Sequence, residues 1–199
     1  MMAVDLNDLK QLRKATGAGM LDCKNALEES GGDMQKAITL LREKGIKVAS
    51  KKAHREAEEG LVTAYIHPPG KLGVLVEINC ETDFVARTDD FQNFAKKVAM
   101  HIAAYPPAVV SREELSREAV EAERRVLMAQ LEGSGKPPEI IEKIIDGRME
   151  KFYSETCLLD QEWADDPEVG TVKDALTDLI GKLRENIVIN RFARFSIGT

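Results

Sequence analysis

The sequence predicts an α+β fold, in which an N-terminal three-helix module precedes a small antiparallel sheet covered by helices. Three observations favour this class. Apolar residues in the first 45 positions recur every three or four residues, which is the helical period. From 62 to 80, and again from 187 to 197, the period shortens to two, as in strands. Long segments between these strands return to the helical period.

The N-terminal module is expected to contain three short helices joined by glycine turns. The first begins after a candidate cap, Asp5, and ends at Gly17, and the second ends at Gly31 and Gly32. Asp33 then caps a third helix, for which glycine marks an end at position 45. A bundle of this size is only marginally stable alone. The apolar residues of the three stripes are Leu6, Leu9, Leu12, Met20, Cys23, Leu27, Ala37, Ile38 and Leu41.

Composition then divides the chain into three parts. Residues 1–46 form the helical module, 47–59 a basic linker that is partly helical, and 60–199 an α+β core. The lysines and arginines between 42 and 55 have two interpretations. They form either a solvated basic linker, which is the commoner case, or a patch that binds an acidic protein surface.

The core begins with a predicted β-hairpin. Val62, Ala64 and Ile66 alternate with Thr63 and Tyr65 along its first strand. A turn at 68–71 leads into the second strand, where apolar residues alternate from 74 to 80. One face of the hairpin should therefore be buried. In the expected register, the numbers of two residues that lie opposite each other sum to about 138.

Helices are expected to follow the hairpin, and a last strand to pair beside it. The first helix has a single apolar face, and two capping boxes, Ser111 with Glu114 and Thr171 with Asp174, predict the starts of two more. Between these two helices, a pair of prolines at 137 and 138 starts another. The last strand, 187–197, alternates again. The apolar face of the first helix consists of Phe91, Phe94, Ala95, Val98 and Ile102.

Composition also excludes several functional classes. The net charge of −6 and the pI near 5.3 argue against nucleic acid as the main partner. Three cysteines without a pairing pattern are typical of a reducing compartment. Asp5 and Asp8 interrupt any signal-peptide core, and no apolar run is long enough for a membrane span. These features predict a soluble cytoplasmic protein that does not associate with membranes.

No catalytic constellation emerges from the motifs. The sequence has no phosphate-binding loop, dinucleotide fingerprint or His/Cys metal cluster, so no cofactor or metal is predicted. Cys80 and His67 are a candidate nucleophile pair because both lie on the hairpin. The expected register places them roughly 25 Å or more apart. Cys23 and Cys80 are therefore interpreted as small buried residues.

The segment 81–88 is the most unusual part of the chain. It joins a buried strand to a helix and places an aromatic residue, Phe84, beside Asp83 in a loop or short turn. From composition alone we expect Phe84 to be buried against its own core, since most phenylalanines are. The alternative is an exposed anchor for a partner.

Two long segments stand out, LRKATGAGMLDCKNAL at 12–27 and EINCETDFVAR at 77–87. In this order and spacing they resemble signatures of the elongation factor Ts family. A third resemblance runs from 135 to 152, so the similarity covers almost the whole chain. The resemblance implies a cytoplasmic guanine-nucleotide exchange factor of elongation factor Tu, which acts in translation without bond chemistry.

The resemblance also assigns residues to the binding of this GTPase. The loop is expected to insert as a wedge with Phe84 as its anchor, and the module 1–46 to contact the same domain. Bundle packing is the alternative role for Met20 and Leu21, and simple solvation is the alternative for Lys24. The wedge residues are Thr82, Asp83, Phe84 and Val85, and the module residues are Arg13, Met20, Leu21 and Lys24.

The chain departs from the longer family members in two places. They contain a duplicated core with an inserted coiled-coil hairpin, whereas this sequence has room for one core unit. The short form is expected to form a homodimer through 60–199, which restores the missing half. Trp163 is followed by Ala164 and Asp165, where the family usually has an apolar pair.

Two other classes of function remain. A three-helix module also resembles ubiquitin-associated or nucleic-acid-binding bundles, so the chain could be a non-catalytic adaptor. Binding of ubiquitin or RNA without binding of the GTPase would support an adaptor. A thiol enzyme is the second class, and turnover that is lost when Cys80 is replaced would support it.

Overall fold

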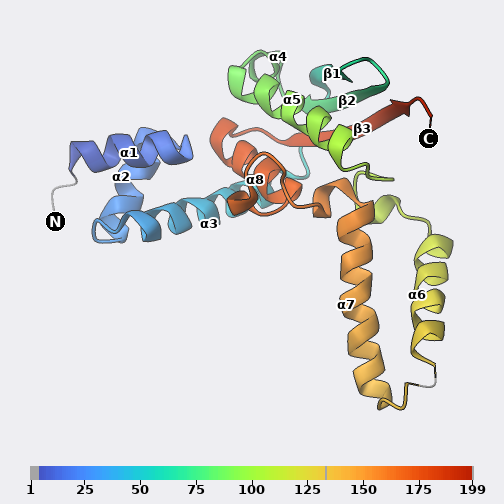
Figure 1. The fold of residues 1–199 in the computed structure, drawn as a ribbon. Helices are drawn as coiled ribbons and strands as arrows, with labels where there is room; N and C mark the ends of the chain where they lie inside the picture. The colour runs from blue at the N-terminus through green and yellow to red at the C-terminus, as the bar shows by residue number, and fades with distance from the viewer. Residues whose placement is uncertain (1–4, 133, 199) are drawn as a thin grey trace. The chain divides into compact units, whose positions relative to one another are not determined.

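The computed structural model describes residues 5–132 and 134–198 (Figure 1). Within these ranges the chain forms two compact units. Unit 1 comprises residues up to 61 together with 78–94 and 174–188. Unit 2 comprises 62–77, 95–173 and the residues from 189 onward. The helices are α1 (Leu6–Thr16), α2 (Met20–Glu29), α3 (Met34–Lys52), α4 (Asp83–Ala86), α5 (Asp89–Ala104), α6 (Arg117–Leu131), α7 (Pro138–Thr156) and α8 (Val172–Leu183).

The fold is α+β, as predicted. Three antiparallel strands form one sheet in the order β1-β2-β3, so β2 is central. The last strand pairs beside the hairpin, and the apolar stripe predicted for α5 is buried throughout. Within the described ranges, no helix is both long and apolar enough to span a membrane. The strands are β1 (Glu59–His67), β2 (Leu72–Cys80) and β3 (Ile187–Ser196).

The N-terminal module consists of α1, α2 and α3, and its predicted caps are confirmed. The Asp5 carboxylate accepts a hydrogen bond from the Asn7 N–H at 2.8 Å, and that of Asp33 accepts one from the Lys36 N–H at 3.0 Å. Gly17 ends α1 in the left-handed conformation, with φ of 65°. These local signals are sufficient to delimit α1 and to start α3.

The core of the module is aliphatic and small. Two members of the predicted stripes lie outside it, because Leu6 is 69% exposed and Met20 is 47% exposed. Leu6 is the first residue of α1 and Met20 is the first residue of α2. Leu6 therefore departs from the predicted stripe, and the exposure of Met20 disfavours bundle packing, which was its alternative role. The residues that do form the core are Leu9, Leu12, Cys23, Ala26, Leu27 and Ala37.

Helix α3 continues through Gly45 to Lys52, so the expected helix end at 45 is wrong. A Cβ atom built on Gly181 of α8 would lie 3.0 Å from Cα of Gly45. The two glycines therefore let α3 and α8 approach more closely than larger residues would allow. A glycine that is needed for packing has the same appearance in sequence as one that ends a helix.

The hairpin register differs by one residue from the expected sum of about 138. A Cβ built on Gly60 would meet Cα of Asn79 at 2.7 Å, and one built on Gly73 would meet Ile66 at 2.9 Å, so opposite residues sum to 139. A shift of one residue moves a whole set of side chains to the other face. Val62 is accordingly 66% exposed and Ile66 63% exposed, whereas the alternating apolar residues of β2 are buried.

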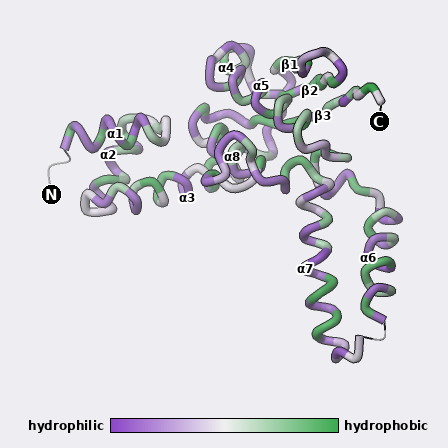
Figure 2. Tube along the Cα trace, viewed as in Figure 1, coloured by the Kyte–Doolittle hydropathy of each residue, from purple (hydrophilic) through white to green (hydrophobic). Residues whose placement is uncertain are grey.

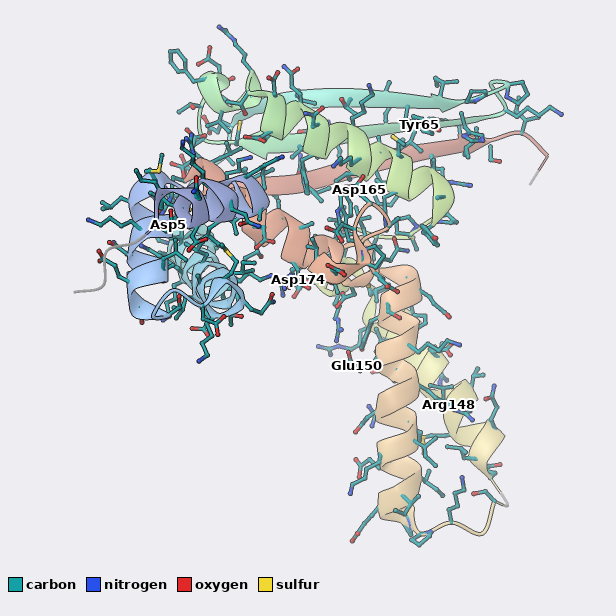
Figure 3. All side chains as sticks on the ribbon, turned by 60° about the vertical axis from the view of Figure 1, so that its left-hand side comes forward. Asp5, Tyr65, Arg148, Glu150, Asp165 and Asp174 are labelled. Carbon is teal, nitrogen blue, oxygen red and sulfur yellow. The ribbon has the colours of Figure 1, made fainter. Side chains whose placement is uncertain are left out.

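In unit 2, helices α6 and α7 form an antiparallel hairpin (Figure 1). Both helices alternate between apolar and polar segments along their length (Figure 2), and the apolar faces meet in a narrow core. The Glu150 side chain projects from α7 (Figure 3). Arg112 donates two hydrogen bonds to its carboxylate, at 2.7 and 3.0 Å. The core residues are Leu127, Leu131, Ile145 and Met149.

The first predicted capping box does not open α6. Ser111 precedes a single 3-10 turn, and the Glu114 carboxylate accepts a hydrogen bond from the Val110 N–H at 3.1 Å. Leu115 then returns to an extended conformation. The true cap is Ser116, whose hydroxyl accepts a hydrogen bond from the Ala119 N–H at 3.1 Å. The second box is in the expected place, since α8 begins directly after Thr171.

A buried aromatic cluster surrounds His101 in unit 2. The Nε2 and Gln161 Oε1 lie 2.9 Å apart, and Nδ1 accepts the backbone N–H of Ala164 at 3.4 Å. The ring stacks on Trp163 at a centroid distance of 5.5 Å. These contacts place Trp163 in the interior and require the neutral imidazole, because Nδ1 acts as an acceptor. Burial lowers the pKa of His101.

Unit 2 should lose stability as the pH falls below about 6.5, the pKa of an unperturbed histidine. Protons then bind the unfolded chain more readily than the folded one, so the free energy of unfolding decreases by up to ~1.4 kcal/mol per pH unit. The fluorescence of Trp163, the single tryptophan, reports unfolding between pH 7.5 and 5.5. His101→Asn should remove much of this pH dependence. An unchanged slope in that variant would contradict the assignment.

Candidate partner-binding surface

The loop assigned to partner binding is a single helical turn. Strand β2 ends at Cys80, and Thr82 then caps the four-residue helix α4 by accepting the N–H of Val85 at 3.4 Å. Asp83 begins the turn and pairs with Arg87 at 2.7 Å. The segment is therefore rigidly bounded by a strand on one side and by α5 on the other.

Phe84 lies on the outer side of α4 and is 78% exposed. The expectation that it packs on its own core is therefore wrong. A turn of four residues can direct only one side inward, and Ala86 occupies that buried position. The structure consequently presents a large rigid aromatic ring to solvent, next to a carboxylate. Such a residue is a suitable anchor for a protein partner.

All four residues assigned to the N-terminal module are also exposed. Leu21 and Met20 begin α2, so bundle packing does not account for either. Arg13 lies in the last turn of α1, and Lys24 pairs with Glu28 at 3.7 Å. Cys23, between Leu21 and Lys24 in the chain, is fully buried as expected. The wedge and the module residues all belong to unit 1.

Sequence inspection missed the residues that hold the loop in place. Glu185, which lies between α8 and β3, bonds to both the backbone N–H and the hydroxyl of Thr82, at 3.0 and 2.7 Å. The following residue, Asn186, donates its N–H to Glu81 at 2.6 Å. These contacts join positions more than 100 residues apart, so no local pattern indicates them. The sequence itself shows only an acidic residue followed by an asparagine before the last predicted strand.

Comparison with known proteins decides the family. A family model described as "Elongation factor TS" matches residues 4–170. Elongation factor Ts of Caldanaerobacter subterraneus subsp. tengcongensis is 58% identical over 190 residues, which cover 96% of this chain and 94% of the relative. The protein of the same name from Fervidobacterium nodosum is 53% identical over 197 residues, covering 99% and 100%. The chain belongs to the elongation factor Ts family.

Family membership supports a role in translation elongation. The relatives are matched over nearly their whole length, and that of Herpetosiphon aurantiacus is 50% identical over 198 residues with both chains fully covered. The family match also includes both groups of candidate binding residues, since it spans α1 to α7 without interruption. Exposed Phe84, its half-buried neighbours in the wedge and the exposed module residues thus form the candidate partner-binding surface of an elongation factor Ts.

The cysteines of this family member are unsuited to nucleophilic chemistry. All three are free and buried, and burial raises the pKa of the Cys80 and Cys157 thiols to about 11. The Cys80 thiol also donates to the Thr82 carbonyl at 3.1 Å. A thiol reacts as the thiolate, so these residues are inert in the folded state.

Alkylation should reveal this protection directly. We expect iodoacetamide at pH 8 to leave all three cysteines of the native protein unmodified during incubation for minutes, and to modify all three in denaturant. The ratio of the two rates should exceed roughly 100 because the thiolate fraction and the access both fall on burial. Mass spectrometry counts the adducts. Rapid native labelling of Cys80 would contradict its burial.

Proposed function

We propose that the chain is the guanine-nucleotide exchange factor of elongation factor Tu. It binds the GDP-bound GTPase, promotes release of GDP, and leaves the site free for GTP. No bond is made or broken by the chain itself. The proposal is supported by family membership and, among the structural features, chiefly by the exposure of Phe84 at the tip of a rigid turn.

In this mechanism α4 acts as a wedge. Asp83 and Phe84 insert into the GTPase domain, with Thr82 and Val85 framing them, and shift an element that supports the nucleotide site. Mg²⁺ and the phosphate-binding loop tolerate little displacement of their ligands, so a small shift weakens GDP binding. By thermodynamic linkage, bound nucleotide lowers the affinity of the GTPase for the factor to the same extent as the factor lowers its affinity for nucleotide. GTP in excess then determines the direction of exchange.

The module 1–46 supplies the second contact. Arg13, Met20, Leu21 and Lys24 project from α1 and α2 as exposed apolar and basic side chains. Exposed apolar groups flanked by charge are typical of a protein interface. We assign this surface to the same GTPase domain, where it retains the factor while the wedge acts.

The decisive experiment is the release of fluorescent GDP from the cognate elongation factor Tu, with and without this protein. Substoichiometric factor should accelerate release in proportion to its concentration, in the presence of excess unlabelled nucleotide. A folded factor that binds the GTPase without accelerating release would leave only an adaptor function. A factor that neither binds nor accelerates would exclude both.

We also assign homodimerisation to residues 60–199, through the outer face of the sheet. Alternation and the register place Val62, Ala64, Ile66 and Leu75 on one face within unit 2, and Phe195 lies exposed on β3. An exposed apolar strip on a sheet usually marks an interface. A second copy of the same strip is self-complementary, which a two-fold dimer requires.

Ile66→Asp should convert the dimer to a monomer. A charge in the centre of an apolar interface lacks a partner and costs several kcal/mol in each of two symmetric positions. Sedimentation equilibrium measures the mass directly. Val126→Asp, at an exposed position of α6 in unit 2, is the matched control and should remain dimeric. A monomeric wild-type protein would exclude this interface.

A further inference from the structure

The wedge is joined to the α8–β3 junction by two reciprocal hydrogen bonds. The Glu81 carboxylate accepts the backbone N–H of Asn186 at 2.6 Å, and the Glu185 carboxylate accepts that of Thr82 at 3.0 Å. Glu81 therefore binds the residue that follows Glu185, and Glu185 binds the residue that follows Glu81. We call these four residues, Glu81, Thr82, Glu185 and Asn186, the carboxylate clasp. Hydrogen bonds to a charged group are stronger than neutral ones.

The second oxygen of Glu185 orients the hydroxyl that caps α4. It accepts the Thr82 hydroxyl proton at 2.7 Å, while the same hydroxyl oxygen accepts the N–H of Val85. A hydroxyl has one proton and two lone pairs, so donation to Glu185 leaves a lone pair for the cap. Glu185 thus acts on α4 through Thr82, and Asp83 and Phe84 follow directly in the chain.

Glu81 and Asn186 of the clasp also contact residues at the end of α3 and just after it. Glu81 contacts Arg55 at 3.2 Å and Lys52 at 3.5 Å, and the Asn186 side chain donates to the Arg55 carbonyl at 2.7 Å. The pKa of Glu81 is lowered, chiefly by the Asn186 N–H and further by the two cations. Such a network restrains its members, since moving one of them leaves buried or half-buried polar groups unpaired.

The residue before Glu185 reaches the other binding element. Arg184 has a φ of 62°, which is unusual for a residue with a side chain, and its guanidinium pairs with Asp22 of α2. Asp22 also pairs with Lys44 of α3 at 2.5 Å. Consecutive residues of one junction are therefore bonded to the helix that carries Leu21 and to the loop that carries Phe84.

We infer that Glu185 is a positioning residue for nucleotide exchange, which holds the wedge through Thr82 without contacting the GTPase. The inference rests on the proposed function. A wedge must transmit its displacement to the partner, and a loosely held turn would itself move instead. Loss of Glu185 should therefore lower the exchange rate at saturating factor much more than it lowers affinity.

The test combines Glu185→Ala, Glu185→Gln and Thr82→Val in a double-mutant cycle. We expect Glu185→Ala to reduce the saturating rate of GDP release about tenfold, with less than a threefold change in half-saturating concentration. Glu185→Gln, which keeps an acceptor, should recover part of the rate. Glu185→Ala combined with Thr82→Val should lose little more than Glu185→Ala alone. Asp90→Ala, which removes an ion pair to Lys182 in the last turn of α8, is the control and should exchange normally.

Amide hydrogen exchange tests the clasp without the GTPase. The Thr82 and Val85 amides should be protected in the wild type and exchange at least tenfold faster in Glu185→Ala, while α1 stays protected. Faster amide exchange with a normal rate of GDP release would overturn the positioning role and leave the proposed function intact. If Glu185→Ala and Thr82→Val each lowered the exchange rate by the same factor and these effects were additive in free energy in the double variant, the positioning role would also be overturned. A wild-type protein without any exchange activity would refute the proposed function instead.

Discussion

Phe84→Ala is expected to reduce the stimulated rate of GDP release by roughly 30-fold or more. Truncation of a central aromatic anchor typically costs at least ~2 kcal/mol of interaction energy, and each ~1.4 kcal/mol corresponds to a factor of ten in rate. The side chain is 78% exposed in the free protein, so its removal takes away few internal contacts. Stopped-flow fluorescence with labelled GDP measures the effect across a range of factor concentrations.

The stability of the variant separates an interface role from a folding role. The free energy of unfolding of Phe84→Ala should stay within about 0.5 kcal/mol of the wild type. Asp83→Ala should also slow exchange, although it additionally removes the pair with Arg87. Met128→Ala, an exposed apolar residue of α6, provides the control and should exchange at the wild-type rate. Wild-type exchange by both the Phe84 and Asp83 variants would refute the wedge.

Gly60→Ala is expected to destabilise the fold by about 3 kcal/mol or more. Gly60 has a φ of 143°, which only glycine adopts readily, and a Cβ there would lie 2.1 Å from the Ile78 carbonyl oxygen. The obstacle is backbone of the adjacent central strand, which cannot rotate away as a side chain could. Relief requires separation of β1 from β2 just before the wedge. Urea unfolding followed by circular dichroism measures the loss.

Gly70→Ala is the matched control in the same hairpin. Its φ of 97° is also positive, but no atom lies within 4 Å of a Cβ built there. The variant should therefore cost only the backbone strain, about 1–2 kcal/mol. A similar loss in both variants would mean that the close approach of β1 to Ile78 is absent in solution.

Local chemistry accounts for most of the elements that the sequence predicts. The caps act within one or two helical turns, so they can be predicted without knowledge of the fold. Asp5 and Asp33 cap through their side-chain oxygens, and Gly17 through its backbone conformation. The α5 stripe is equally clear because sixteen helical residues repeat one periodic pattern. Where two local signals compete, as at Ser111 and Ser116, the sequence cannot rank them.

Register and exposure depend on partners that are distant in the chain. The role of Gly45 is defined by its close approach to Gly181 of another helix. In the hairpin, the numbers of opposite residues sum to 139 rather than 138, which places Val62 and Ile66 on the exposed face. The face of a strand changes with a single residue of slip, whereas the sequence pattern of alternation is the same in both registers.

For the binding surface too, some features can be predicted from the sequence and others depend on the tertiary structure. The motif around Asp83 and Phe84 is visible in sequence, and its resemblance to the elongation factor Ts family identifies the loop. The exposure of Phe84 and the bond between Thr82 and Glu185 were decided only by the tertiary structure. The reason is physical: a contact across 103 residues depends on where β2, α8 and β3 bring the chain together, and no local propensity encodes that meeting point.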